Sequence, residues 1–351
     1  MFGATDKAEL SGFDPRRRAL LVAHQNHWAM SYDPQGSPAN LLAEAMGLLR
    51  VPGAAPAGLF SMAVASTMSK IAVSNRQAPQ AGGEIRPAAV AGQFYPARAE
   101  EIDRMLDEWF SGGVQPEPWA GALVPHAGWI YSGRLAAAVF RRVKFPRRVI
   151  VLAPKHNAEG ADWAVAPHRT WQLPGRTLES DPELARQLAD SISGLVLDAA
   201  AHGREHSIEV QLPLLARLAP QARVVGIAIH GGDLDALERF AEQLAGVLAS
   251  LDERPLLVVS SDMNHYANEA QTRLRDRMAL DALESLDPER LYHTVLEQQI
   301  SMCGVLPAVV AMKTLRRLNS LSRYEEVGYA TSAETSGDRQ RVVGYAGALF
   351  A

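Results

Sequence analysis

Several features that would assign this chain to a specialised class are scarce in its 351 residues or missing from them. Cysteine occurs once, at Cys303, so no intrachain disulfide can form and nothing calls for an oxidising compartment. Lys and Arg number 35 against 39 Asp and Glu, which leaves no basic excess of the kind that nucleic-acid-binding domains carry. The first ten residues lack a basic stretch followed by an apolar one, which argues against a secretory signal. We therefore expect a cytoplasmic protein that does not bind nucleic acid.

The segment 51–69 has no charged residue and has to be weighed as a membrane span. Pro52, Gly53 and Pro56 interrupt it, and the part after Pro56 is shorter than the roughly 20 apolar residues that a spanning helix needs. We expect a buried or partner-contacting helix here, and no association with a membrane.

Residues 1–83 differ in pattern from the rest of the chain and are predicted to form an N-terminal extension and linker of unknown role. A short strand is expected near 19–23 and a helix near 40–49. Residues 74–83 have the Pro, Gly, Asn and Gln content of a linker.

Residues 84–351 alternate between short aliphatic runs and helical periods. Buried strands are predicted at 121–124, 148–152, 222–229 and 255–260, followed by two closing strands at 325–331 and 341–350. Helices are predicted at 134–142, 182–193, 207–218, 234–250, 269–286 and 289–298. Asp-Pro pairs at 181–182 and 287–288 support two of the helix starts, since Asp is a good N-cap and proline suits the first turn. Strands alternating with helices predict a three-layer α/β/α domain around a central mixed sheet.

Three separated segments each place one potential metal ligand beside a strand end or a helix start, namely His126, His156 and Cys303. In open α/β sheets, ligands bind beyond the carboxyl ends of the strands, where the loops converge. Taken alone, His126 could simply bond the backbone, and Cys303 could be a small buried hydrophobe. Together, two imidazoles and a thiol predict a metal site with open positions, suited to a soft or borderline metal and to redox or oxygen chemistry. A helix start near Cys303 is also expected to lower its thiol pKa.

Two further segments carry groups that could act at the same edge of the sheet. Asp262 and His265 follow the fourth predicted strand, where His265 could serve as acid or base and Asp262 could orient an imidazole or hold a water. The structural alternative is that Ser261 or Asp262 caps a turn. His206 opens a predicted helix, and it either points into the crevice or is capped reciprocally by Glu209; both alternatives stay open.

The motifs of residues 85–351, taken in order, resemble the Memo-like proteins, whose bacterial members are often called AmmeMemoRadiSam system protein B. The resemblance rests on the opening segment 85–96, Pro125-His126-Ala127-Gly128, His206-Ser207-Ile208-Glu209, Ser260-Ser261-Asp262 with His265, and Cys303-Gly304. It implies a fold similar to that of the catalytic subunit of class III extradiol (LigB-type) dioxygenases, which use non-haem Fe(II).

By this resemblance His126, His156 and Cys303 match the metal-binding positions, and Asp262 and His265 match residues that line the same pocket. Iron is the expected metal, with copper as the alternative. The resemblance implies redox or dioxygenase-type activity on an unknown small molecule, or else a non-catalytic adaptor that binds a metal or a peptide. The dioxygenases have a carboxylate where this chain has cysteine, so ring cleavage does not transfer directly. Radical-SAM and AMMECR-type proteins are the partners that the resemblance implies.

Four side chains are expected to contact the substrate: His206, Trp129, Tyr131 and Lys155. Trp129 and Tyr131 follow the His126 loop closely in the sequence. Lys155 adds a positive charge at the expected pocket mouth, where it either favours an anionic substrate or is a solvated loop lysine.

Residues 1–67 lie outside the resemblance and end just before Met68, which could itself begin a protein. We expect them to be an accessory extension or an over-extended reading frame that contributes nothing to the metal site. The alternative is that the strand near 19–23 joins the main sheet.

Overall fold

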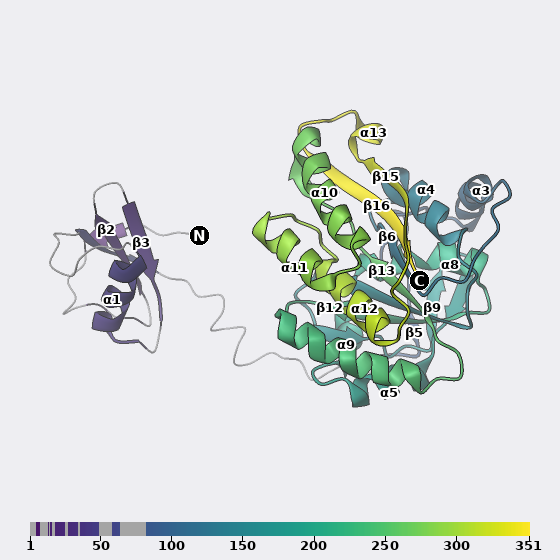
Figure 1. Cartoon of the computed structure of the whole chain (residues 1–351), viewed down its shortest axis with the longest axis horizontal. Coiled ribbons are helices and arrows are strands. Elements are labelled where there is room, and N and C mark those ends of the chain that lie inside the picture. The colour runs from purple at the N-terminus through teal and green to yellow at the C-terminus, as the bar shows by residue number, and fades with distance from the viewer. Residues whose placement is uncertain are drawn as a thin grey trace. The chain divides into compact units, whose positions relative to one another are not determined.

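The structure, a computed structural model, describes residues 5–7, 13, 15, 18–24, 27–33, 36–48, 58–63 and 82–351. The chain divides into two compact units, residues 1–76 and residues 77–351 (Figure 1). Every residue that the sequence assigns to the candidate site belongs to the second unit.

The first unit contains a four-stranded antiparallel sheet in the order β1-β4-β2-β3. Its described elements are β1 (Thr5–Lys7), β2 (Arg18–His24), β3 (His27–Ser31), α1 (Pro38–Leu48) and β4 (Gly58–Ala63). Leu20 and Val22 alternate along β2 and share a small core with Leu41 and Ala45 of α1. The predicted strand near 19–23 and helix near 40–49 are confirmed, and β2 pairs with β3 and β4 within this unit.

The prediction of a helix within 51–69 was wrong for the residues that the structure describes there. Residues 58–63 form strand β4, which pairs antiparallel with β1 and with β2, and the rest of the segment lies outside the described residues. A short apolar run without a clear period fits a strand or a helix alike, and here pairing on both sides decides the outcome. In the described part of the chain, no helix is long and apolar enough to cross a membrane.

The second unit is built on a nine-stranded mixed sheet in the order β11-β8-β12-β7-β13-β6-β16-β14, with β15 also paired to β16. Its strands are β6 (Gly121–Val124), β7 (Arg148–Pro154), β8 (Trp163–Val165), β11 (Val196–Leu197), β12 (Arg223–Ile229), β13 (Leu256–Ser260), β14 (His265–Ala267), β15 (Tyr324–Thr331) and β16 (Val342–Phe350). The central strands β12, β7, β13 and β6 run parallel, whereas β16 joins β6 antiparallel. The carboxyl ends of β7, β13 and β6 therefore lie next to one another at one edge.

Helices cover both faces of this sheet. One core joins Ile150 and Leu152 of β7 to α5 (Pro182–Ser191), α9 (Leu234–Ala249), α10 (Glu269–Glu284), α11 (Pro288–Glu297) and α12 (Val305–Arg317). The other core joins Val149 and Val151 to α3 (Ala99–Trp109), α4 (Trp129–Phe140) and α8 (Leu212–Leu218). Successive side chains of a strand point to opposite faces, so β7 contributes to both cores. The predicted three-layer α/β/α fold with a mixed sheet is confirmed.

The remaining elements are short. They are α6 (Ala199–Gly203), α7 (His206–Glu209), α13 (Ala333–Ser336), and a three-stranded sheet of β5 (Ile85–Arg86), β9 (Thr170–Leu173) and β10 (Arg176–Glu179). The single helix predicted over 207–218 was wrong, because α7 and α8 are separate. Pro213 in the first turn of α8 has no N–H to donate to the carbonyl oxygen of Glu209, so a continuous helix is interrupted there.

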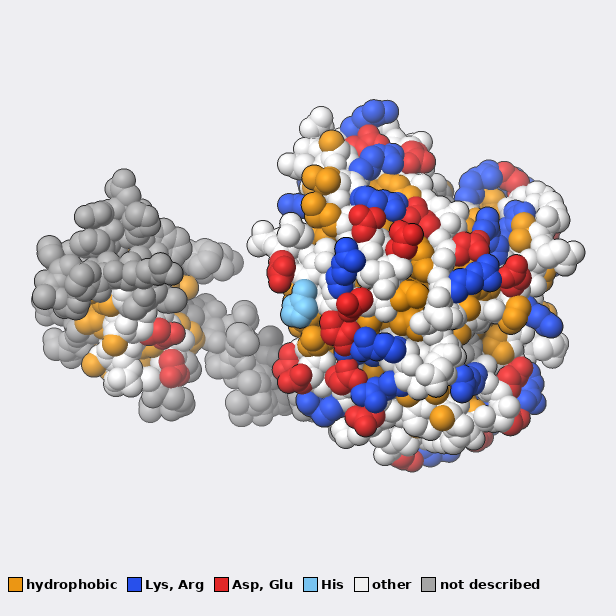
Figure 2. Space-filling model, viewed as in Figure 1, with side chains coloured by type: hydrophobic (Ala, Val, Ile, Leu, Met, Phe, Trp, Pro, Cys, Tyr) orange, Lys and Arg blue, Asp and Glu red, His pale blue; other side chains and the backbone are white. Residues whose placement is uncertain are grey.

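Charged side chains of both signs are interspersed on the face of the second unit that Figure 2 shows. One buried cation, Lys313 of α12, lies between Glu238 of α9 and Glu289 of α11 and ties the three helices together. Such mixing leaves no extended field of one sign on this face.

Candidate metal centre

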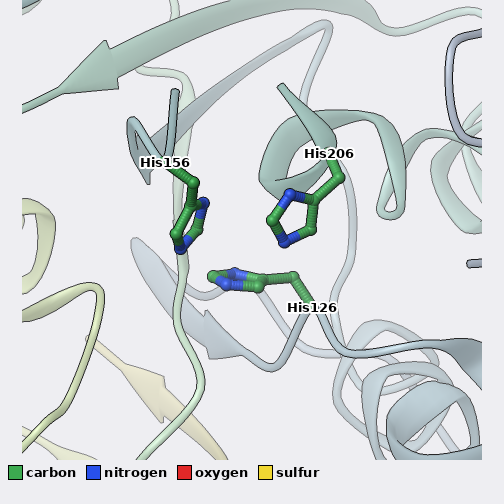
Figure 3. Close-up of side chains that lie close together, drawn as sticks. All are labelled: His126, His156 and His206. Carbon is green, nitrogen blue, oxygen red and sulfur yellow. The ribbon is translucent and has the colours of Figure 1, made fainter. Parts of the chain in front are cut away.

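Three histidines from separate loops converge beyond the strand ends (Figure 3). His126 follows β6, His156 follows β7, and His206 is the first residue of α7. One ring nitrogen of each lies within 4.8 Å of those of the other two. The rings of His156 and His206 are stacked with their centroids 4.6 Å apart, and the His126 ring stands edge-on to both. The structure thus brings His126 and His156 together and adds His206 to them.

The hydrogen bonds around His126 determine which of its ring nitrogens carries the proton. Its Nδ1 lies 3.0 Å from Oγ of Ser260, whose hydroxyl donates to the carbonyl oxygen of Ser207 at 2.6 Å. Gln211 Nε2 also donates to Ser260 Oγ, at 3.0 Å. The single hydroxyl hydrogen is already used, so Ser260 accepts from His126, and Nδ1 is the protonated nitrogen. Nε2 of His126 keeps its lone pair for a metal.

A buried carboxylate, Glu205, orients the His156 imidazole and lies close to that of His206. Its Oε1 accepts the Nδ1–H of His156 at 2.9 Å and lies 3.4 Å from Nδ1 of His206, while Oε2 accepts the backbone N–H of His156 at 2.6 Å. Burial alone would raise the pKa of Glu205, but these bonds and the one from the Ser207 N–H hold it well below its ordinary value. A metal-ligating histidine commonly donates its second ring nitrogen in this way, which leaves Nε2 free.

Two members of the cluster have strongly lowered pKa values. Burial lowers the pKa of His126 well below its ordinary value, and the neighbouring histidines lower it further. Burial also lowers the pKa of His206 to about 4, although the Glu205 carboxylate opposes the shift. Both rings are therefore neutral at pH 7, and the neutral imidazole is the form that binds a metal.

Cys303 approaches the cluster through His126. Its Sγ lies 3.3 Å from Nε2 of His126 and accepts the backbone N–H of Asp262 at 3.2 Å. The predicted helix start is confirmed, since α12 begins at Val305, but the expected lowering of the thiol pKa is not found. Burial, helped by the charge of Asp262, raises the pKa of Cys303 and outweighs the helix start. Among the described residues, the group of mutually close ligand atoms contains His206 where the sequence analysis placed Cys303.

The buried carboxyl group of Asp262 is bonded to the loop that carries His126 and does not cap a local turn. It is 5% exposed, and its Oδ1 accepts the backbone N–H groups of His126 at 2.8 Å and of Ala127 at 3.2 Å. It therefore fixes the loop that carries His126. Burial raises the pKa of Asp262 to about 6, against the lowering effect of those bonds, so this carboxyl group titrates near neutral pH.

His265 lies on β14, beyond Asp262, and is partly exposed. Its Nδ1 is 2.8 Å from the carbonyl oxygen of Ser301, and its backbone N–H donates to Ser301 Oγ at 2.7 Å. A carbonyl oxygen only accepts, so Nδ1 carries the proton and Nε2 is able to accept another. The ring is held in a fixed orientation with a basic nitrogen available.

The two aromatic residues expected to contact substrate have different surroundings. Trp129 is 2% exposed and its Nε1–H donates to the carbonyl oxygen of Val210 at 3.1 Å, whereas Tyr131 is 37% exposed. Both nevertheless line one cavity at the start of α4.

Lys155 is buried and bonded within its own loop. The side chain is 5% exposed, and Nζ donates to the carbonyl oxygens of Glu159 at 3.0 Å and Gly160 at 3.3 Å. Its ammonium group therefore holds its own loop, because a buried charge requires hydrogen-bonding partners. It is therefore not a solvated loop lysine, and its contact with a substrate stays a prediction.

The helix that begins at His206 is capped by the residue that precedes it. Glu205, which the sequence analysis did not single out, accepts the N–H of Ser207 at 3.0 Å. Glu209 is turned away into a fully buried cluster, where it pairs with Arg86 and accepts the hydroxyl of Tyr95. Of the two alternatives left open for this helix, the reciprocal cap by Glu209 is not formed, because the buried Arg86 guanidinium holds that carboxylate elsewhere.

The fold and site define an α/β protein with a histidine cluster beyond the ends of its parallel strands. Residues 86–349 match the family model described as Memo-like protein. A MEMO1 family protein of Aquifex aeolicus is 36% identical over 271 residues, which cover 76% of this chain and 99% of that protein. One of Methanopyrus kandleri is 33% identical over 279 residues, covering 76% and 98%. The chain belongs to the Memo-like family, and the resemblance read from its motifs is confirmed.

A solved structure, of an uncharacterized protein from Escherichia coli K12, aligns with a TM-score of 0.44 and 14% identity over 64% of this chain and 98% of that one. This likeness is too weak to bear on function.

Proposed function

We propose that this chain is a metal-dependent redox protein, whose iron is held by His126, His156 and His206 with Cys303 as a further ligand. The observation that carries the proposal is the convergence of three imidazoles, with one ring nitrogen of each within 4.8 Å of those of the other two. Ser260 and Glu205 engage Nδ1 of His126 and of His156, which turns the lone pair of Nε2 to the cluster.

The donor set suits such a metal. Two ligand atoms bound to one ion at about 2.0 and 2.3 Å are separated by about 3.5 Å at a tetrahedral angle. The distance between Cys303 Sγ and His126 Nε2 is 3.3 Å. Imidazole nitrogen and thiolate sulfur favour iron, copper or zinc over magnesium or calcium, and a thiol that binds a metal loses its proton whatever its pKa in the metal-free protein.

A bound iron ion would supply redox chemistry and open positions for oxygen and a substrate. Around it, Glu205 holds the His156 ring in the tautomer that presents Nε2. The carboxyl group of Asp262, with its pKa raised to about 6, exchanges a proton just below neutral pH, and Nε2 of His265 keeps a lone pair that can accept one, so the chain offers two groups for proton transfer. These groups support proton-coupled chemistry on a small molecule.

Metal analysis of protein purified without oxygen tests the proposal. We expect one iron per chain in the wild type, and its loss in His126→Ala and His156→Ala. The exposed Glu159→Gln variant, changed on the same loop as His156, serves as the control and should keep its metal. Copper at the same stoichiometry would correct the metal, while full occupancy in both histidine variants would contradict the site.

Oxygen uptake separates the redox protein from a binding module. We expect uptake that requires both Fe(II) and an added catechol and that is lost in His265→Gln. Stoichiometric iron without any oxygen consumption would instead support the adaptor that the family resemblance leaves open. The partner proteins and the cytoplasmic location stay predictions.

A further inference from the structure

A pocket beside the histidine cluster carries an inference about the substrate, which rests on the proposed function. We propose that this pocket binds an uncharged, apolar ring or chain of the molecule that reacts at the metal. Its volume is about 420 Å³, within the usual range for small-molecule sites. It lies between the loop before α3 and the first turn of α4, and its apolar wall includes Phe94, Tyr95, Met105, Trp129, Ile130 and Tyr131.

Two of the aromatic side chains in the wall, Tyr95 and Trp129, have their polar atoms bound elsewhere. The Tyr95 hydroxyl donates to Glu209 at 2.7 Å, and the Trp129 indole N–H donates to the carbonyl oxygen of Val210 at 3.1 Å. Both rings are at most 3% exposed, so they present carbon to the cavity. A polar ligand group placed against these two rings would lose its hydration without gaining partners from them, which is costly.

Backbone groups around the pocket are also hydrogen-bonded within the protein. The N–H of Trp129 donates to the carbonyl oxygen of Phe94 at 2.7 Å, and the N–H of Gly92 to that of Tyr95 at 2.7 Å. The charges at the rim are one of each sign, Arg98 and Glu101. Gln93 and Tyr131, both exposed, add a side-chain amide and a hydroxyl to the lining. The pocket therefore carries no net charge, and its buried part selects by shape and apolar area.

Phe94 links the pocket to the metal centre. Its side chain lines the pocket, and its ring lies 4.4 Å from the ring of His206, measured between centroids. Gly128, two residues after His126, lines the same cavity, and a Cβ built there would lie 3.6 Å from the carbonyl oxygen of Phe94. A molecule in the pocket is thus separated from a proposed ligand by one aromatic ring.

Exposed apolar side chains mark the entrance. Ile130 is 67% exposed and Tyr131 is 37% exposed, although both are large and lie on the first turn of α4. Large apolar side chains beside a cavity are typical of ligand-binding surfaces, since covering them removes apolar area from water. An apolar group of a small molecule fits the buried rings of the wall, the bonded backbone, the contact through Phe94 and the exposed apolar entrance.

Binding of small neutral and charged aromatics to the Co²⁺-loaded full chain tests the proposal. Indole and benzyl alcohol should bind saturably and about tenfold more tightly than benzoate or benzylammonium, since a difference of about 1.4 kcal/mol is tenfold in affinity. Ala97→Phe, an exposed position in the pocket wall, should abolish this binding by filling the cavity. The matched control is Ala270→Phe, an exposed alanine on α10, which should bind as the wild type does.

The Co²⁺ absorption spectrum should change when indole binds, because the pocket adjoins His206. Failure of indole to bind, equal affinity for benzoate, or normal binding in Ala97→Phe would each overturn the proposal. Binding without any spectral change would overturn the assignment of the pocket to the metal centre. The pocket wall contains none of the proposed ligands, so indole should also bind the metal-free protein. A protein that binds indole but no metal would therefore contradict the proposed function and not the pocket.

Discussion

Glu205 and Asp262 are both buried carboxylates bonded to a histidine of the cluster, yet their pKa values are displaced in opposite directions. Glu205 is 2% exposed and Asp262 is 5% exposed, so burial penalises the charge of both. The pKa of Glu205 nevertheless lies well below its ordinary value, whereas the pKa of Asp262 is raised to about 6. The difference lies in the donors that each carboxylate receives.

Glu205 accepts from both the ring and the backbone of His156, from the backbone of Ser207, and from the amide of Asn157 at 3.3 Å. Asp262 accepts the backbone N–H groups of His126 and Ala127 on one oxygen. Enough donors compensate for burial and keep a carboxylate charged, whereas fewer donors leave burial dominant. Glu205 is thereby suited to orient ligands permanently, and Asp262 to exchange a proton.

The largest expected effect concerns the thiol beside Asp262. Changing Cys303 to Ser removes a proposed ligand and should weaken metal binding by more than about 100-fold, whereas Asp262→Ala removes only a group behind the ligands and should cost about 10–100-fold or less. Titration of the metal-free variants with Fe(II) or Co(II) measures both effects. Metal occupancy in Cys303→Ser equal to that of the wild type would count decisively against the assignment of Cys303.

Glu205→Gln comes next and tests the orienting role. An amide in place of the carboxylate turns N–H groups toward donors, so metal affinity should fall about 10–100-fold. The free energy of unfolding of the metal-free protein should also fall by about 1–3 kcal/mol, the usual result of leaving a buried group unsatisfied. Denaturant titration and metal titration check the two effects. Glu159→Gln, which changes an exposed carboxylate of the neighbouring loop, should show neither.

The pH dependence of stability should separate the two sides of the cluster in metal-free protein. His206, with its pKa lowered to about 4, binds a proton in the unfolded chain but not in the folded one between about pH 4 and 6.5. Its contribution to stability therefore rises with pH across that window. Asp262, with its pKa raised to about 6, binds a proton in the folded chain that the unfolded chain releases above about pH 4. Its contribution falls as the pH rises through 6.

Two substitutions that replace a titratable side chain by an uncharged amide should reveal these opposite slopes of stability against pH. Relative to the wild type, Asp262→Asn should gain stability more steeply between pH 4 and 6, and His206→Gln less steeply. Each of the two pKa shifts corresponds to a change of about 3 kcal/mol in the free energy of unfolding across this pH window. Denaturant midpoints measured at intervals of pH check the slopes, with His293→Gln, an exposed position of α11, as the control. Parallel curves for all three proteins would show that neither group is displaced as described.

The parts of the fold that sequence reasoning predicted are those in which one local signal dominates. The aliphatic runs at 121–124 and 256–260 are fully buried strands, and a run of that composition has few other uses. The strands β8 to β11 are two to four residues long and depend on their neighbours, so they were not predicted. Helix α3 was also missed, although Ile102, Leu106 and Trp109 lie on one face at helical spacing and its signal was available.

Sequence reasoning located mainly those residues of the candidate site that follow the ends of predicted strands. His126 and His156 were found because loops after parallel strands converge at one edge. Glu205 was not singled out, because its partner His156 is 49 positions away and nothing local links the two. The hydrogen bond from His126 to Ser260 was missed for the same reason, because the two residues are 134 positions apart. Raised and lowered pKa values depend on burial and donors, which only the assembled fold supplies.

The smallest expected effect is that of removing the first unit. Both carboxylates and all four proposed ligands belong to residues 77–351, and the family match covers 86–349. The relative from Aquifex aeolicus is matched over 99% of its length by 76% of this chain. Strand β2 pairs with β3 and β4, so the main sheet does not depend on it for a neighbour. A chain that begins at Met68 should therefore fold and bind metal at the wild-type stoichiometry.

Within that shortened chain, Glu205→Gln and Asp262→Asn should have the same effects on metal affinity and on the pH slope as in the full chain, because contributions from independent parts of a structure add. Circular dichroism and metal titration of the shortened wild type and both variants provide the measurement. An insoluble or unfolded product would show that the second unit needs residues 1–67, and the small core around Leu20 and Leu41 would then support the larger domain and not only its own sheet. A folded product with altered pH slopes would show instead that the first unit influences the surroundings of one carboxylate.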